Sequence, residues 1–405
     1  MKPFALLLLP TLALATAPAR APAPRAAALL VALDPQAEGL VPRMEADLSR
    51  ALGTYDELQV RTPEALYGQP VDPGAQAALE RAKGAYADAL SAFVAKKPGR
   101  AEERVRASLQ EVPAAAAAMR GCTPLCDATA LLAGMLLERG EPDDAKHALL
   151  DLMALDPTYA LSPQRFRREL LALRAEVGTS HAAALRGSAT VVARPAGARV
   201  YLDGEALGYA PVSIPALAVG AHLVRVERPG FRTEGQLLQA GADEQTVTVA
   251  LTATPAYSAA RAKLDAVVRE LGKEAPSPAA VALGKSLGLE RALLGSVRTL
   301  PDGAGSELAL ALYELGSGKR LALRRMKLQG DEFGQLQGEL ERLVNHLFAE
   351  AAGGSARAVQ SSDPLDHTQG TEEWSGEDRG GKSRQAEKKR KATDPLDTVS
   401  GTEDW

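Results

Sequence analysis

The sequence predicts a multidomain α+β protein, in which an α/β domain is split by an inserted helical segment and a small β-sandwich and is followed by a disordered tail. Three observations predict this class. Residues 27–66 have the pattern of strand, helix and strand, but the strands that could complete a sheet come only after residue 256. Residues 74–177 keep helical spacing. Residues 188–252 contain short alternating strands separated by turns.

Length and composition agree with several small domains. At 405 residues the chain is too long for one ordinary core. Aromatic residues make up only 4% of it, so Ala, Leu and Val must fill most of the cores. The net charge of −4 gives no general attraction to nucleic acid or anionic lipid, and we predict no nucleic-acid partner.

Residues 1–21 have the pattern of a secretory signal peptide, with Lys2 before an apolar run and small residues at the cleavage spacing. Cleavage is expected after Ala17, Ala19 or Ala21. An uncleaved anchor is the alternative, but the run is shorter than the roughly 20 residues that a spanning helix needs. No later segment is long and apolar enough, so we expect no transmembrane segment in the mature chain.

Residues 27–66 form the first part of the α/β domain. The apolar run from Leu29 to Leu33 has strand length, and residues 58–60 resume an extended pattern. Between them, apolar residues recur at four-residue spacing on one face of a helix, at Leu40, Met44, Leu48 and Leu52.

Residues 74–177 form the predicted helical segment, in which six prolines are expected at helix boundaries: Pro98, Pro113, Pro124, Pro142, Pro157 and Pro163. One part resembles a single tetratricopeptide repeat, through Leu132, Ala133, Leu136, Gly140, Ala145, Leu149 and Pro157. The resemblance implies two antiparallel helices that meet at small residues. One repeat cannot bury its own apolar face, so neighbouring helices must stack on it.

The only cysteines, Cys122 and Cys126, are four residues apart around a proline. A local structural disulfide is the prediction for a secreted protein. A metal site needs further ligands, and no histidine is near in sequence; a redox pair usually has two intervening residues rather than three. We therefore predict no metal ion and no cofactor.

The segment 188–252 is rich in turn signals. Pro195 and Gly197 favour a tight turn, and Asp203 with Gly204 is a strong hairpin signal. Between the two turns, residues from Ala198 onward alternate between apolar and polar. A last alternating strand is expected around residues 246–251. This pattern predicts a compact β-sandwich.

These residues resemble the PEGA domain, through the stretches "PAGARVYLDG", "GYAPVSIPAL" and "GAHLVRVERPGF". The chain departs from the family at Ala196, which stands where the family has Glu. The resemblance implies a small β-sandwich common in bacterial surface and envelope proteins, usually without catalytic activity. Its polar candidates for chemistry are expected in turns or on solvated strand faces; they are Asp203, Glu205, His222 and Glu227.

Residues 256–352 read as helix, strand, a hairpin across Gly316 to Gly318 and a final amphipathic helix. They lack leading strands, and residues 27–66 lack trailing ones, so the two parts are expected to form one domain that carries the insertions. The order resembles the N-terminal domain of the periplasmic protein TolB. Two separate small units are the alternative.

Motifs for catalysis are weak. "GKS" at 284–286 lacks the Gly that a phosphate-binding loop needs at position 279 and reads as helix interior, and "GSGK" at 316–319 reads as a turn. The sequence contains no nucleophile elbow, zinc-protease motif or cluster with metal-ligand spacing. We therefore predict no catalytic residues and no enzyme, although scattered catalytic residues remain an alternative.

The tail, residues 353–405, contains a repeat: "DPLDHTQGTEEW" and "DPLDTVSGTEDW". Each copy ends in one of the two tryptophans of the chain, an arrangement that suits short-motif recognition. The linker at 379–391 is basic and has no apolar periodicity, so it is expected to be disordered. A duplicated, solvated spacer is the alternative. The candidate contact residues are Asp363, Asp366, Trp374, Asp394, Asp397 and Trp405.

Together these patterns predict a non-enzymatic scaffold or protein-interaction protein of the bacterial cell envelope, secreted across the inner membrane and periplasmic or bound to the cell surface. The alternative is a module that binds peptidoglycan or another glycan. An enzyme is the third hypothesis.

Overall fold

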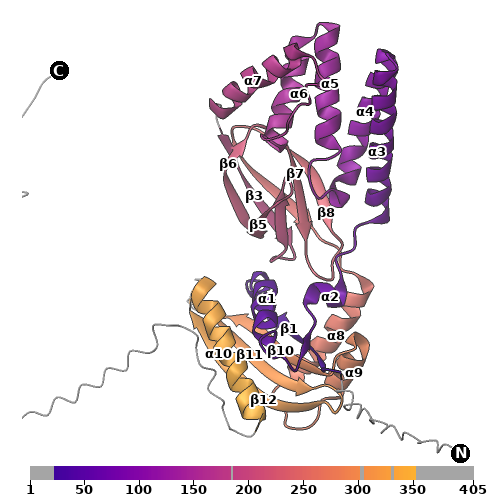
Figure 1. The fold of residues 1–405 in the computed structure, drawn as a ribbon. Helices are drawn as coiled ribbons and strands as arrows, with labels where there is room; N and C mark the ends of the chain where they lie inside the picture. The colour runs from indigo at the N-terminus through magenta and orange to yellow at the C-terminus, as the bar shows by residue number, and fades with distance from the viewer. Residues whose placement is uncertain (1–21, 184–185, 302–304, 330–332, 353–405) are drawn as a thin grey trace, which may run out of the picture. The chain divides into compact units, whose positions relative to one another are not determined.

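The computed structural model describes residues 22–183, 186–301, 305–329 and 333–352, and Figure 1 labels its helices and strands. The predicted mixed α+β class is confirmed. The predicted signal peptide and the Trp-ended repeats lie outside the described residues.

The first and last parts of the described chain share one five-stranded sheet, with the strand order β12-β11-β10-β1-β2. Strands β1 and β10 are parallel, with Ala26 opposite Arg291. Strand β10 then pairs with β11, and β11 with β12, as an antiparallel meander. The strands are β1 (Arg25–Ala32), β2 (Gln59–Val60), β10 (Arg291–Thr299), β11 (Gly305–Glu314) and β12 (Lys319–Gln329).

Both faces of this sheet are covered by helices, which explains the continuous apolar run in β1. Alternate residues such as Ala28 and Leu30 pack with α1 and α10, while Leu29 and Val31 pack with α8 and α9. These helices are α1 (Val41–Leu52), α8 (Pro255–Glu270), α9 (Pro278–Leu287) and α10 (Phe333–Ala351); the short η1 (Ala37–Gly39) and α2 (Pro63–Tyr67) flank α1 in the chain.

Asp34 ties the two parts of the α/β domain together just after β1. Its Oδ2 accepts a 2.7 Å hydrogen bond from the backbone N–H of Thr299, and its Oδ1 accepts bonds from the Thr299 hydroxyl and the Ala37 N–H. Burial raises the pKa of Asp34, but these hydrogen bonds together lower it, and the net pKa lies below its usual value.

The inserted helices are α3 (Pro73–Val94), α4 (Pro98–Ala115), η2 (Ala116–Ala118), α5 (Leu125–Arg139), α6 (Pro142–Leu155) and α7 (Arg168–Ala183). Prolines 73, 98 and 142 each lie in the first turn of a helix, where the missing N–H costs nothing. The prediction that every proline marks a boundary was wrong for Pro113, which lies inside α4. Only two further residues of α4 follow it, so little of the helix is affected.

The helix pair α5–α6 has small residues where the sequence predicts close packing. Ala133 and Ala145 are fully buried. Gly140 ends α5 in the left-handed conformation with φ of +87°, and Pro157 follows the end of α6. The assignment of this pair to the tetratricopeptide repeats stays a prediction.

Residues 186–250 form two sheets, β6-β3-β9 and β5-β4-β7-β8. Their inner faces enclose a core rich in Val and Ala, which includes Val191, Val200, Val226 and Val249. Strands β3 and β9 are parallel, and the other pairs are antiparallel. The strands are β3 (Arg186–Arg194), β4 (Arg199–Leu202), β5 (Glu205–Tyr209), β6 (Val212–Ala218), β7 (Gly220–Glu227), β8 (Glu234–Ala240) and β9 (Glu244–Ala250).

Candidate functional site

Two tight turns shape the two ends of β4. The Arg194–Pro195 peptide bond is cis, Gly197 has φ of +79°, and Ala198 after it is fully buried. Asp203 and Gly204 join β4 to β5 with φ values of +52° and +98°, the pair of positive angles that a two-residue type I′ hairpin requires. All of these turn residues therefore have structural roles in the sandwich.

The side chain of Asp203 joins this hairpin to β7. Its Oδ1 accepts a 2.7 Å bond from the Leu223 N–H, and its Oδ2 lies 2.7 Å from Nδ1 of His222. Nε2 of His222 lies 2.8 Å from the carbonyl oxygen of Ala218. Burial lowers the pKa of His222, but the bond and charge of Asp203 and the carbonyl of Ala218 raise it, and the net pKa shift is upward. Because both ring nitrogens face acceptors, this geometry fits the charged imidazolium.

His222 and Glu227 are only 2% and 6% exposed, so the prediction that their side chains are solvated was wrong. Glu227 accepts a hydrogen bond from Arg225, and the Arg225 guanidinium lies 4.1 Å from the centre of the Tyr201 ring. The alternation did not reveal this burial because β7 is covered on both faces. On the side away from the sandwich core, Leu223 belongs to the core of the helical segment.

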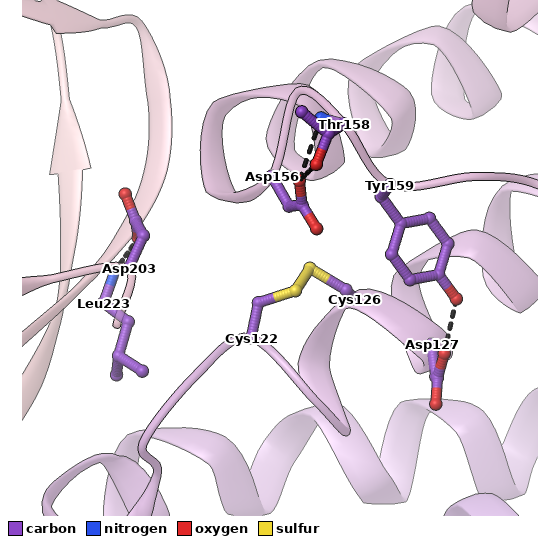
Figure 2. Close-up of a disulfide and its surroundings, with 8 residues drawn as sticks. All are labelled: Cys122, Cys126, Asp127, Asp156, Thr158, Tyr159, Asp203 and Leu223. Atoms are coloured by element: carbon purple, nitrogen blue, oxygen red, sulfur yellow. Dashed lines mark hydrogen bonds between the residues drawn. A yellow bond between two sulfur atoms is a disulfide. The ribbon is translucent and has the colours of Figure 1, made fainter. Parts of the chain in front are cut away.

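Cys122 and Cys126 form a disulfide at the start of α5, shown in Figure 2. Cys126 is fully buried, and its N–H donates a 2.8 Å bond to the carbonyl of Cys122. The next residue, Asp127, accepts a hydrogen bond from the Tyr159 hydroxyl. The loop after α6 is held in turn by Asp156, which accepts bonds from the N–H and hydroxyl of Thr158.

The backbone just before the disulfide supports the hairpin of the sandwich. A Cβ atom at Gly204 would lie 2.9 Å from the carbonyl oxygen of Arg120 and 3.3 Å from Cα of Gly121. The Asp203–Gly204 turn therefore packs directly on the backbone that leads into Cys122. The closed loop and the hairpin form one contact between the helical segment and the sandwich.

Glu45, on α1, occupies a junction that sequence reasoning missed. Its Oε1 accepts a 2.8 Å bond from the Leu30 N–H, in a stretch of β1 beyond the two residues paired with β2. A cavity of about 20 Å³, room for about one water, is lined by Glu45 together with Tyr67, Arg228 and Arg261. Burial raises the pKa of Glu45 to about 7, although the Leu30 bond and the charges of Arg228 and Arg261 lower it. One acidic residue on an otherwise ordinary amphipathic helix carries no sequence signal for such a position.

A second, larger cavity of about 230 Å³ opens on the helical segment, and we call it the α5–α7 groove. Its apolar wall consists of Phe93, Leu137, Phe166 and Leu170. Charged side chains complete the lining, namely Glu138, Arg165, Arg167 and Glu169. Phe166 packs on α5 because position 134 is Gly; a Cβ there would lie 3.3 Å from its ring.

Residues 186–255 match the family model of the PEGA domain, in agreement with the resemblance drawn from the turn motifs. No curated protein matches the chain. Among the residues described, no three His, Cys, Asp or Glu side chains are grouped so that they could hold a metal ion. Within the same residues, no helix has the length and apolar character needed to cross a bilayer.

Proposed function

We propose that this chain is a secreted, non-enzymatic protein-interaction scaffold of the bacterial cell envelope. The PEGA match indicates a periplasmic or extracellular binding module. One observation supports the non-enzymatic part of the proposal: three of the four polar candidates for chemistry in the sandwich, Asp203, His222 and Glu227, form hydrogen bonds within the sandwich itself. Asp203 holds His222 and Leu223, and Glu227 holds Arg225.

The disulfide supports secretion, because disulfides persist in oxidising compartments and are rare in the cytosol. Alkylation of thiols in rapidly quenched cells, followed by peptide mass spectrometry, measures its state in the cell. Cys122 and Cys126 are expected to resist alkylation until a reductant is added. Free thiols in the mature chain would contradict an oxidising location.

The interaction role is tested by crosslinking in intact cells, with mass spectrometry of the captured partners. The full chain is compared with a chain truncated after Val359 and with the double variant Trp374→Ala, Trp405→Ala. The double variant Thr371→Ala, Thr402→Ala is the matched control, since it changes the same repeats beside their aromatic ends. Partners that disappear on truncation and in the Trp variant, but not in the Thr control, support recruitment through the repeats.

The other outcomes separate the alternatives. Protein partners that persist without the tail place the binding surface on the folded part and still support a scaffold. Cell-wall fragments without protein partners favour the glycan-binding alternative, which predicts that the truncated chain sediments with purified wall. Recovery of neither proteins nor wall fragments with any form of the chain would overturn the proposed function.

A further inference from the structure

We propose that a pocket between the helical segment and the sandwich binds small organic carboxylates, which are anions with an apolar body. Helices α6 and α7 form one side of it and β6 forms the other (Figure 1), and we call it the β6–α7 pocket. Its volume of about 350 Å³ lies within the roughly 300–1,000 Å³ of pockets that take small ligands. The proposal goes beyond the scaffold function and does not depend on it.

His181 lines this pocket without a hydrogen-bond partner. It is only 6% exposed, and Val177, one turn earlier on the same face of α7, packs in the core of the helical segment. Neither ring nitrogen of His181 bonds to any residue that the structure describes. Because buried polar groups are nearly always hydrogen-bonded, an unpaired imidazole at a pocket wall indicates a position for a polar group of a ligand.

Arg186 supplies an uncompensated positive charge in the same pocket. It is the exposed first residue of β3, and it forms no ion pair with a residue in the described part of the chain. Its charge lowers the pKa of His181, so the two side chains act on the same space. A guanidinium binds carboxylates through charge-assisted hydrogen bonds. One carboxylate can therefore accept hydrogen bonds from Arg186 and from His181.

Asp203 is the only acidic residue among the described residues that line the pocket, and it does not cancel this charge. Its Oδ1 accepts a backbone N–H of β7, and its Oδ2 pairs with the His222 imidazolium. On α6, Asp151 accepts the N–H of Ala221 and is not part of the lining. The Asp203–His222 pair is neutral overall, so the charge of Arg186 gives the lining a net positive charge that selects an anion.

The remaining walls are apolar and favour an aliphatic body on that anion. Met153 and Ala154 come from α6, and Ile214 and Leu217 come from β6; each is at most 9% exposed. An inorganic anion would leave these walls without a partner. A short aliphatic chain covers them and gains the free energy of apolar burial.

A bound carboxylate should also change the protonation of His181. In the free protein, burial and the charges of Arg186 and His222 lower the pKa of His181. An anion beside the ring offsets these charges and raises that pKa, so binding should take up a proton. We therefore expect the affinity to rise as pH falls from about 8 to 6. His222 becomes charged over the same range and acts in the same direction.

Proton NMR of the full chain during a titration with hexanoate tests the proposal. The chain has five histidines, and a His181→Gln chain identifies the ring signals of His181. Hexanoate should shift these signals and raise the pKa that they report. Hexanamide has the same apolar body without the charge, and hexylammonium has the opposite charge. Both should bind at least about tenfold more weakly, because neither can form the charge-assisted contact with Arg186.

Two arginine variants locate the carboxylate. Arg186→Gln should weaken hexanoate binding about tenfold, the loss expected for one charge-assisted hydrogen bond. The matched control is Arg194→Gln, which makes the same change at the exposed last residue of β3, outside the lining. It should bind hexanoate as the native chain does. The ring signals of His222, which depend on the pair with Asp203, report whether the sandwich stays folded in both variants.

Hexanoate that leaves the His181 signals unchanged would overturn the proposal. Hexanamide that binds as tightly as hexanoate would overturn it too, because the pocket would then recognise only an apolar chain. Inorganic phosphate that binds at least as tightly would show that the apolar walls have no role. Equal affinities of the Arg186→Gln and Arg194→Gln chains would place the carboxylate elsewhere. None of these results changes the capture of protein partners, so the crosslinking experiment tests the scaffold separately.

Discussion

His222 and Asp203 form a hydrogen-bonded pair that links the β4–β5 hairpin to β7, with Nδ1 and Oδ2 2.7 Å apart. The other ring nitrogen meets the carbonyl of Ala218, so the fold selects the imidazolium. The pair serves the architecture of the sandwich, and it makes stability depend on pH.

Stability should therefore fall as pH rises through the folded-state pKa of His222. That pKa is raised above its unfolded value of about 6.5. The contribution of His222 is therefore complete below the unfolded value and is lost above the folded one. Urea unfolding between about pH 5.5 and 8.5 measures it, and His222→Gln should flatten this part of the profile.

The test needs a His181→Gln background. Burial, Arg186 and His222 all lower the pKa of His181. The effect of His181 on stability therefore runs opposite to that of His222, because its protonation destabilises the fold as pH falls. With Arg186 and Asp203 unchanged, comparing this background with and without the His222→Gln substitution isolates the pair. Equal profiles for the two chains would contradict the imidazolium assignment.

Glu45→Gln should stabilise the protein above about pH 7, where the carboxyl of the native chain ionises. The raised pKa means that Glu45 contributes stability below its unfolded pKa and loses it as pH rises through about 7. The pKa rises from 4.5 to about 7, and each pKa unit corresponds to about 1.4 kcal/mol, so the gain is at most roughly 3 to 4 kcal/mol. The amide oxygen of Gln can still accept the Leu30 N–H.

Thermal melts of the Glu45→Gln variant at low and high pH measure this effect. The matched control is Glu80→Gln, which makes the same chemical change at an exposed position of α3. If Glu80→Gln raises the melting temperature at high pH as much as Glu45→Gln does, or if neither raises it, then burial does not destabilise the ionised Glu45 carboxyl.

Loss of the disulfide should cost about 2 kcal/mol of unfolding free energy, as the chain-entropy account gives for a loop this short. The double variant Cys122→Ser, Cys126→Ser tests this by urea denaturation. A reductant should shift the midpoint of the native chain to that of the variant and leave the variant unchanged. An unfolding midpoint of the native chain that does not change on complete reduction of the disulfide would contradict the prediction.

Gly204→Ala should destabilise more than Gly140→Ala. The two glycines have similar φ values, +98° and +87°, so both substitutions add backbone strain of about 1 kcal/mol. Only at Gly204 does the new Cβ also meet backbone, 2.9 Å from the Arg120 oxygen, whereas nothing lies within 4 Å of a Cβ at Gly140. Chemical denaturation of both variants measures the difference, and equal losses would show that the hairpin does not pack on the disulfide loop.

Local patterns were sufficient for much of the fold. Asp203-Gly204 is a hairpin signal because few residue pairs accept two positive φ values, and the structure has the hairpin there. The apolar run at Leu29–Leu33 predicted a strand, and the double coverage of β1 explains why it does not alternate. The prediction of a helix boundary at Pro113 was wrong, because a proline near the end of a helix removes little of the hydrogen bonding of that helix.

The candidate site was harder to predict than the fold. We expected His222 and Glu227 in turns or on solvated strand faces, yet both are buried in the structure. Glu45 and the α5–α7 groove depend on segments far apart in the chain, such as Phe93 beside Phe166. Neither has a local pattern.

The helices, strands and turns of this protein follow from local sequence, because helix caps, hairpin angles and apolar periodicity depend on neighbours a few residues away. The sequence also supplied the PEGA motifs and the duplicated Trp-ended segment. Which polar side chains are buried, paired or charged depends instead on how the elements pack together. Burial and pKa depend on what packs against a residue in space, and at β7 and α1 those neighbours come from distant parts of the chain.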